Sequence, residues 1–255
     1  MAHTEALFEG LAAGWPPTIR WYRPTKPALV LGHGQAPEHA DLAAARAAGV
    51  PVFRRTSGGA AVWIDRAALS LDIALPVRHP LISGDVTLAY RWVGKCWAAA
   101  LRELGIVSTR AIPTDEVRAL APLAPDDPLR LACYGALSPW EAVVGERKVV
   151  GLSQIRRRAG VLYPIGVHLR WRPERLTRLL ALAPRERRAL NKSLRQAAAG
   201  LDQLAGRAIP AIEVMAAVER ALVRRHGVIL VPGDWSAAEE AAAERLERER
   251  FQPLG

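Results

Sequence analysis

Cys133 and Lys148 are the two residues whose types and spacing first suggest chemistry. Cys133 precedes Tyr134-Gly135 and follows a Pro- and Asp-rich loop at 119–128, and Lys148 comes fifteen positions later. A thiolate is a nucleophile, and a lysine on a core-facing strand position can hold a carboxylate, a phosphate or a developing oxyanion. None of the six histidines has a spacing that marks it as a base for the thiol. Taken alone, Cys133 fits a packing role better than a catalytic one, and Lys148 fits an edge strand in solvent.

A second candidate is the segment RRTSGGAAVW at 54–63, which joins two predicted strands through Gly58-Gly59. Glycines let a ligand approach the main chain closely, and the exposed N–H groups can bind an anion or a carbonyl oxygen. Arg55 and Ser57 add a charge and a hydroxyl beside the turn. The alternative is an ordinary hairpin, and the arginines before it favour a binding loop only modestly.

Charge is concentrated in one part of the chain. From Arg147 to Arg195 there are fourteen Arg and Lys residues against Glu174 and Glu186, a local balance of +12, while the whole chain carries +10. This density indicates an anionic partner or, with equal weight, a solvated Arg-rich surface. Without zinc spacing, a helix-turn-helix pattern or interleaved aromatics, nucleic acid ranks below a protein or cofactor partner.

Two cysteines form no disulfide framework and show no metal-binding spacing, and Cys96 lies on an apolar helix face, where we expect it to pack. The N-terminal sequence lacks the basic and apolar regions of a signal peptide, and no apolar run reaches the length of a membrane span. We therefore expect a soluble, cytoplasmic protein without membrane association.

The elements that must position these residues alternate between strands and helices without a regular βαβ repeat. Period-2 patterns and turn residues predict strands at 18–22, 28–32, 51–55, 60–64, 69–76, 140–145, 147–157 and 160–169. Period-3.6 patterns predict helices at 3–14, 37–48 and 84–105 and helical structure from Pro173 onward, ending at 236–250. We expect an α+β fold, with a mixed or antiparallel sheet core flanked by helices.

Taken together, these segments resemble the lipoate–protein ligase and octanoyltransferase superfamily, which is related in fold to the catalytic domain of biotin protein ligases. The resemblance covers most of the first 200 residues, and it is strongest to the cysteine-dependent octanoyltransferases. Their motif combines a Cys-aromatic pair, a Ser-x-aromatic-Glu group and a Lys-x-x-Gly strand. Here these are Cys133-Tyr134, Ser138 with Trp140-Glu141, and Lys148 with Gly151.

The resemblance implies octanoyl transfer from octanoyl-acyl carrier protein to a lysine of a lipoyl domain, in lipoate biosynthesis, through a Cys133 acyl-enzyme. Lys148 would hold the acyl carbonyl, and no cofactor or metal would be needed, because a thioester is already activated. Acceptors of this class are the glycine cleavage H protein and the E2 of 2-oxoacid dehydrogenases. The implied substrate-binding residues are Arg55, Ser57, Gly58, Gly59, Ala60, Trp63, Gly151 and Gln154. It also implies a catalytic domain at 1–205 and a helical extension at 206–255 packed on that domain.

This chain departs from the family pattern at Ala60, where a third glycine is usual, and at Ile64 and Pro164-Ile165, where histidines are usual. One alternative is an ATP- and Mg-dependent lipoate–protein ligase that acts through a lipoyl-adenylate. Another is acyl transfer between lipoyl proteins, and a third is a divergent, non-catalytic protein that binds acyl chains or lipoyl domains. The natural acyl group, the acceptor and the oligomeric state are left open.

Overall fold

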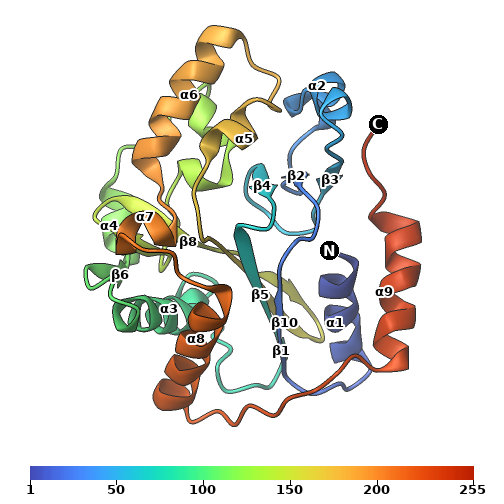
Figure 1. Cartoon of the computed structure of the whole chain (residues 1–255). Helices are drawn as coiled ribbons and strands as arrows, with labels where there is room; N and C mark the ends of the chain where they lie inside the picture. The colour runs from blue at the N-terminus through green and yellow to red at the C-terminus, as the bar shows by residue number, and fades with distance from the viewer.

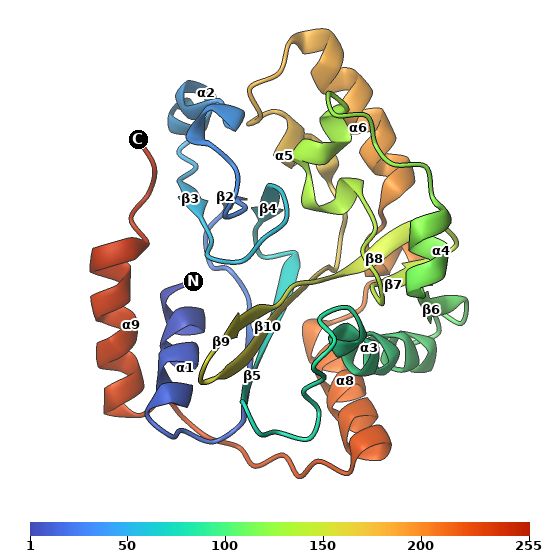
Figure 2. The same ribbon diagram turned by 180° about the vertical axis from the view of Figure 1, so that it is seen from behind.

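A computed structural model describes all residues 1–255, and an antiparallel sheet runs through its centre (Figure 1). The strand order is β1-β5-β10-β8-β7-β6, and β9 pairs with β10 outside that path (Figure 2). The bounds are β1 Thr18–Tyr22, β5 Ala68–Pro76, β6 Thr109–Ala111, β7 Ala142–Val144, β8 Arg147–Leu152, β9 Ile155–Arg157 and β10 Gly160–His168. The predicted α+β fold with a mixed or antiparallel sheet is confirmed.

Period-2 alternation in β5 and β10 builds the main core. Successive side chains of a strand point to opposite faces, so alternate residues meet across paired strands. In the register observed, Ile73 faces Tyr163 and Leu71 faces Ile165, and all four are buried in one apolar cluster. The intervening positions turn to the other face, where Leu162 packs with helix α1 (Ala2–Ala12).

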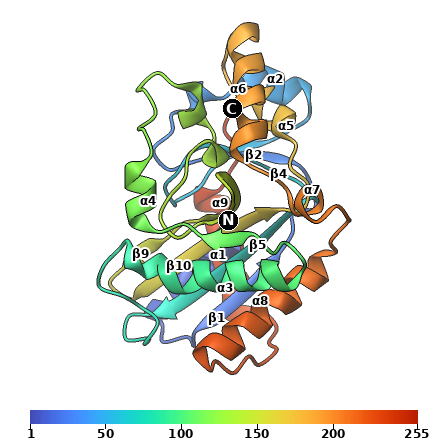
Figure 3. The ribbon, with the colours of Figure 1, turned by 90° about the vertical axis from the view of Figure 1, so that its left-hand side faces the viewer.

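Helices cover both faces of this sheet (Figure 3). On one face, α3 (Arg91–Glu103) packs against α8 (Ala211–His226), and both contribute apolar side chains to the main core. On the other face lies α1, with α9 (Ala237–Arg250) packed beside it. The last residues return to the body of the protein, where the Leu254 N–H donates to the Val52 carbonyl at 2.7 Å.

A smaller sheet carries the glycine segment. Its order is β3-β2-β4, with β2 (Ala28–Leu31) parallel to β3 (Val52–Arg54) and antiparallel to β4 (Val62–Ile64). A second apolar cluster joins it to α5 (Pro173–Thr177) and α6 (Pro184–Ala197). The remaining helices are α2 Leu42–Ala47, α4 Thr114–Ala119 and α7 Leu201–Ala205, and 3-10 turns span Pro37–His39, Leu88–Tyr90, Pro128–Leu131 and Cys133–Gly135.

Three predicted elements are wrong in extent. The helix predicted at 37–48 is a 3-10 turn at Pro37–His39 followed by α2, because the Asp41 side chain accepts the Ala44 N–H and caps a separate helix. The strand predicted at 147–157 is two strands, because the chain leaves β8 at Leu152 and the Ser153 N–H donates to Pro164 before β9 begins. The helix predicted at 84–105 starts at Arg91, because the Asp85 carboxylate accepts the N–H groups of the next turn and fixes a separate bend. None of the helices has the length and apolarity needed to cross a lipid bilayer.

Candidate active site

The glycine segment forms a tight loop that abuts the end of β2. Gly59 has φ +92°, a conformation that favours glycine, and a side-chain carbon built on Gly32 would lie 1.7 Å from the Gly59 carbonyl oxygen. Gly32 is therefore required by close backbone contact. Its own N–H donates to the side chain of Gln35 at 3.0 Å, which closes the turn after β2.

Side chains from three parts of the chain hold this loop in place. The Arg55 guanidinium donates to the carbonyls of Gly58 and Ala60, each at 2.9 Å through Nη2. The Thr56 hydroxyl donates to the buried carboxylate of Glu5 on α1 at 3.2 Å. The Ser57 carbonyl accepts the His33 N–H at 3.0 Å. The main-chain groups that hold the loop are its carbonyls, and these contacts leave its backbone N–H groups free to bind a ligand.

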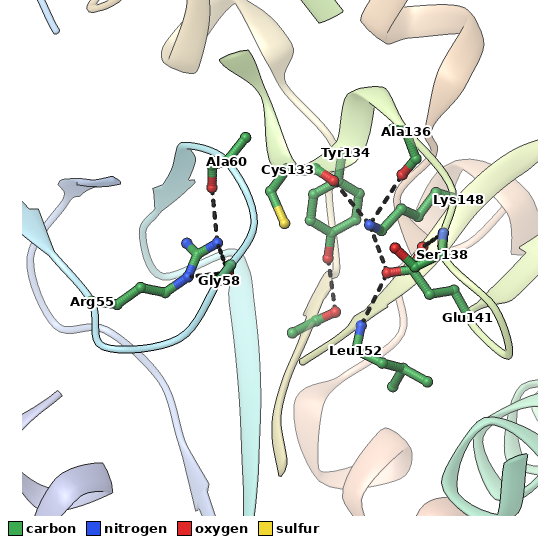
Figure 4. Close-up of polar contacts among 11 residues, drawn as sticks. Arg55, Gly58, Ala60, Cys133, Tyr134, Ala136, Ser138, Glu141, Lys148 and Leu152 are labelled. Carbon is green, nitrogen blue, oxygen red and sulfur yellow. Dashed lines mark hydrogen bonds and ion pairs between the residues drawn. The ribbon is translucent and has the colours of Figure 1, made fainter. Parts of the chain in front are cut away.

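Cys133 begins a 3-10 turn that is attached to β4 by main-chain hydrogen bonds. Its N–H donates to the Ala61 carbonyl at 2.8 Å, and the Ala61 N–H donates to the Leu131 carbonyl at 3.0 Å. A side-chain carbon built on Gly59 would lie 3.8 Å from the Cys133 sulfur and 2.8 Å from Arg55 Nη2. The half-buried thiol therefore faces the glycine loop, as Figure 4 shows. No backbone N–H from Ser57 to Ala60 donates to an acceptor within the protein.

Lys148 lies on the other side of the Cys133 turn and reaches it through the backbone (Figure 4). Its ammonium group donates to the Cys133 carbonyl at 2.9 Å and to the Ala136 carbonyl at 3.3 Å, and it pairs with Glu141 Oε1 at 2.7 Å. Its three protons thus have three acceptors, and the side chain is almost fully buried. In this arrangement the ammonium orients the backbone at Cys133 and makes no hydrogen bond to the sulfur.

Glu141 is held by the sharp turn that precedes it. Trp140 has φ +68°, the only positive φ outside glycine, and this conformation directs the Glu141 carboxylate back toward the Ser138 N–H at 2.9 Å. The carboxylate also accepts the Leu152 N–H at 3.2 Å. Such donors, together with the ammonium, satisfy a buried carboxylate on several sides.

The ion pair shifts both of its pKa values. Burial by itself lowers the pKa of Lys148, but the Glu141 carboxylate more than offsets this, and the lysine pKa is raised. Burial raises the pKa of Glu141, against the opposing effect of Lys148 and the two backbone N–H groups. A charged lysine is thus kept inside the protein by a specific partner.

Tyr134, the residue after Cys133, is buried beneath the candidate site. Its hydroxyl donates to the Gly166 carbonyl on β10 at 2.7 Å, and burial raises its pKa well above the ordinary value. A side-chain carbon on Gly151 would lie 3.4 Å from Lys148 Cε and 3.7 Å from the Tyr134 hydroxyl. Gly151 therefore leaves room for both side chains. His168 packs edge-on against Tyr134, and burial lowers its pKa to about 4.

The structure brings together most of the residues that the sequence selected. The Cys133 thiol faces the loop that contains Arg55, Ser57, Gly58, Gly59 and Ala60, whereas Lys148 binds the Cys133 carbonyl and Gly151 lies beside Lys148 and Tyr134. Ala60 has no positive φ, so its backbone accepts a side chain where a third glycine was expected. Trp63 and Gln154 make their contacts elsewhere. The Trp63 indole N–H donates to Asp65 at 2.8 Å, and the Gln154 amide donates to the Val86 carbonyl at 2.6 Å.

The role of Glu141 was not assigned from the sequence, although the residue stands in the motif. Its signal was a carboxylate seven positions before a core-facing lysine, at the other side of the Gly145 hairpin. Antiparallel pairing of β7 and β8 places such residues near each other. Tyr134 was likewise noted only as the neighbour of Cys133.

Comparisons of the sequence with known proteins agree with this geometry. Residues 1–223 match the lipoyl protein ligase A/B catalytic domain family. The chain is similar to octanoyltransferase LipM of Kyrpidia tusciae, with 32% identity over 96% of this chain and 89% of that protein. It is also similar to octanoyltransferase LipM of Geobacillus kaustophilus, with 30% identity over 99% of this chain and 90% of that protein.

Solved structures share the fold. A crystal structure of lipoate-protein ligase A bound with ATP superposes with a TM-score of 0.73 at 20% identity, over 97% of this chain and 88% of that chain. A bipartite lipoate protein ligase of Thermoplasma acidophilum, described with its E2 lipoyl domain, gives 0.74 at 21% identity over the same shares. At 20–21% sequence identity, the structural similarity supports a shared fold only.

Proposed function

The chain belongs to the lipoyl protein ligase A/B catalytic domain family, and on that premise we propose that it moves an octanoyl group from acyl carrier protein to a lipoyl-domain lysine. The octanoyltransferases to which it is similar over nearly its whole length make it an enzyme of the acyltransferase class. The acyl group is carried in two steps through a thioester on Cys133. One observation carries this proposal: the Cys133 sulfur faces a glycine loop whose N–H groups have no protein acceptor.

In the first step, the Cys133 thiolate attacks the carbonyl carbon of the donor thioester. A carbon–sulfur bond to Cys133 forms, the bond to the carrier sulfur breaks, and the carrier leaves as a thiol with the proton that Cys133 gave up. The tetrahedral intermediate bears an oxyanion, which backbone N–H groups stabilise when they point at it. The N–H groups of residues 57–60 have no acceptor within the protein and belong to the loop that the sulfur faces, which makes them the candidates for this role.

In the second step, the acceptor lysine attacks the acyl-enzyme as a neutral amine. A carbon–nitrogen bond forms, the bond to Cys133 breaks, and the amine proton passes to the departing thiolate. The products are an octanoyl amide and the free thiol. No phosphate bond is consumed, so the proposed reaction needs neither ATP nor a metal ion. The acceptors are lipoyl domains of the glycine cleavage H protein or of a 2-oxoacid dehydrogenase E2.

Two cationic side chains lie near the Cys133 turn and can stabilise the oxyanion. The Arg55 guanidinium lies beside the loop near the sulfur, and Lys148 lies behind the Cys133 carbonyl. For Lys148 to touch the acyl oxygen as well, it would exchange its longest hydrogen bond, the one to Ala136.

The test is intact-mass analysis after incubation with octanoyl-acyl carrier protein in the absence of ATP. We expect one octanoyl group on the protein, localised to Cys133 by peptide mapping, and loss of that group when a lipoyl domain is added. Cys133→Ala abolishes the adduct, and Cys96→Ala, which removes a thiol buried in the main core, retains it.

The outcomes separate this reaction from its alternatives. If the protein stays unmodified while ATP and free lipoate modify a lipoyl domain, the transferase proposal is wrong and a ligase is indicated. Octanoyl transfer that survives Cys133→Ala would exclude the acyl-enzyme. If neither reaction proceeds although octanoyl chains bind, the protein is a non-catalytic binder.

A further inference from the structure

An arginine-lined groove that includes Trp63 of β4 contains none of the residues of the proposed chemistry. It has a volume of about 710 Å³ and is formed by the turns around β4, the end of β10 and helix α5. Two aspartates, Asp65 and Asp202, also line it. Its arginines are Arg23, Arg66, Arg170, Arg172, Arg175 and Arg178.

The positive charge of the groove is mostly uncompensated. Asp202 pairs with Arg170 at 2.7 Å. Asp65 accepts the indole N–H of Trp63 and the N–H of Ala67, each at 2.8 Å. The other five arginines make no ion pair within the protein. A concave surface with several such guanidinium groups concentrates anions.

Three of these arginines lie on α5 and at its two ends. Arg175 is within the helix, Arg172 is the residue before it, Arg178 is the residue after it, and all three line the groove. Arg178 also lies over the ring of Trp63, 5.5 Å from its centroid. Guanidinium forks match the geometry of phosphate and carboxylate oxygens, often with two parallel hydrogen bonds. These three arginines thus suit a phosphate or carboxylate group of a binding partner.

Strand β4 links the groove directly to the nucleophile. At one end of this segment the Ala61 carbonyl accepts the Cys133 N–H, and at the other Trp63 and Asp65 line the groove. With a rise of about 3.3 Å per residue, the four steps from Ala61 to Asp65 span about 13 Å along an extended chain. A reactive group on a flexible arm reaches across this distance.

We infer that the groove docks the acyl donor, an acidic carrier protein whose thioester arm is attached through a phosphodiester. This inference rests on the proposed function, because it assigns one of the two substrates to a surface. Electrostatics favours the donor over the acceptor: the donor presents an anionic phosphodiester beside its reacting group, whereas the acceptor presents a lysine ammonium. A groove with five uncompensated arginines attracts the first and repels the second.

The variant that tests this is Arg172→Glu/Arg175→Glu, with Arg172→Gln/Arg175→Gln as a milder form that changes less charge on the partly buried Arg175. Its matched control is Arg185→Glu/Arg188→Glu, which changes the net charge equally at two exposed positions of α6 outside the groove. Rates of Cys133 acylation are measured with octanoyl-acyl carrier protein and with a small octanoyl thioester that lacks a phosphate.

We expect the groove variant to lower the ratio of carrier-donor to small-donor kcat/KM by about tenfold or more, with a weaker salt dependence, because desolvated phosphate contacts with arginine are lost. The control keeps the ratio of the unchanged protein, and the Gln variant falls between the two. An unchanged ratio in the Glu variant overturns the inference while the proposed function stands. A raised KM for the lipoyl-domain acceptor, or binding of RNA lost in the same variant, assigns the groove to another partner and also overturns it. If the unchanged protein is acylated by neither thioester, the proposed function itself fails.

Discussion

Replacing Glu141 by Gln removes the negative charge that keeps Lys148 inside the protein. The carboxylate accepts three donors: the lysine ammonium, the Ser138 N–H and the Leu152 N–H. A glutamine has the same size but only one acceptor oxygen, so its NH₂ group must face one of these donors. The variant therefore leaves a buried N–H unmatched and the ammonium without its counter-charge.

The magnitude follows from the burial of the pair, in which both side chains are less than a twentieth exposed. Breaking such a pair by removing one partner costs about 3–5 kcal/mol, and because Gln keeps one acceptor we expect about 3 kcal/mol. Urea unfolding at pH 7 measures this loss of free energy of unfolding. The double variant Glu141→Gln/Lys148→Met should recover at least ~1 kcal/mol relative to Glu141→Gln alone, because it removes the uncompensated charge.

The pH dependence gives a second check. In the unchanged protein the pKa of Lys148 is raised, so its stabilising contribution is complete below the ordinary value of 10.5 and is lost as pH rises through the folded-state pKa. In Glu141→Gln the two contributions of the carboxylate that raise the lysine pKa are lost, burial and the Arg55 charge outweigh what remains, and the pKa falls, so the variant regains stability as pH rises toward 10. The two proteins should converge between pH 7 and 10. A variant within about 0.5 kcal/mol of the unchanged protein at pH 7, or a difference that stays constant to pH 10, would refute the reasoning.

Two further predictions concern the glycine loop and the buried histidine. Gly32→Ala should slow Cys133 acylation about 100-fold, because the new methyl displaces the Gly59 carbonyl and with it the loop; Gly34→Ala, which meets no neighbouring atom, is its control, and equal rates in the two variants would contradict the assigned contact. His168→Phe should make the free energy of unfolding less dependent on pH in the acidic range. The unfolded chain takes up a proton near pH 6.5 that the folded histidine refuses until about 4, so His168 costs about 3 kcal/mol as pH falls between these values. Urea unfolding from pH 7 to 4.5 should show that the free energy of unfolding falls less in the variant than in the unchanged protein. If the two free energies of unfolding fall in parallel with pH, the prediction is wrong.

Much of the fold followed from local pattern. The alternation in residues 69–76 and 160–169 predicted the two central strands, because a strand with one face in a core must alternate apolar and polar positions. Short elements escaped this reasoning. Strand β6 and helix α4 span three and six residues, too few for a period to emerge. Their conformation is set by pairing with β7 and by the flanking turns.

The candidate site also has features that the sequence predicted and features that only the folded chain shows. Acyl-transfer chemistry was implied by the resemblance of the combined Cys133, Lys148 and Gly58-Gly59 motif to the octanoyltransferases, because that combined motif is far more specific than its parts. Which atoms meet was decided only by the folded chain. The sulfur of Cys133 faces Gly59, whereas the ammonium of Lys148 binds the Cys133 carbonyl and Glu141.

Contacts between segments that are far apart in sequence determine the surroundings of the remaining residues. Trp63 follows the glycine loop in sequence, yet its ring lies beneath Arg178 in the arginine-lined groove. The sequence by itself determined the longer strands and helices and which chemical groups the protein carries, since both depend on local pattern and residue type. The tertiary structure alone decided which partners each charge has, because burial and pairing arise only when remote segments pack together.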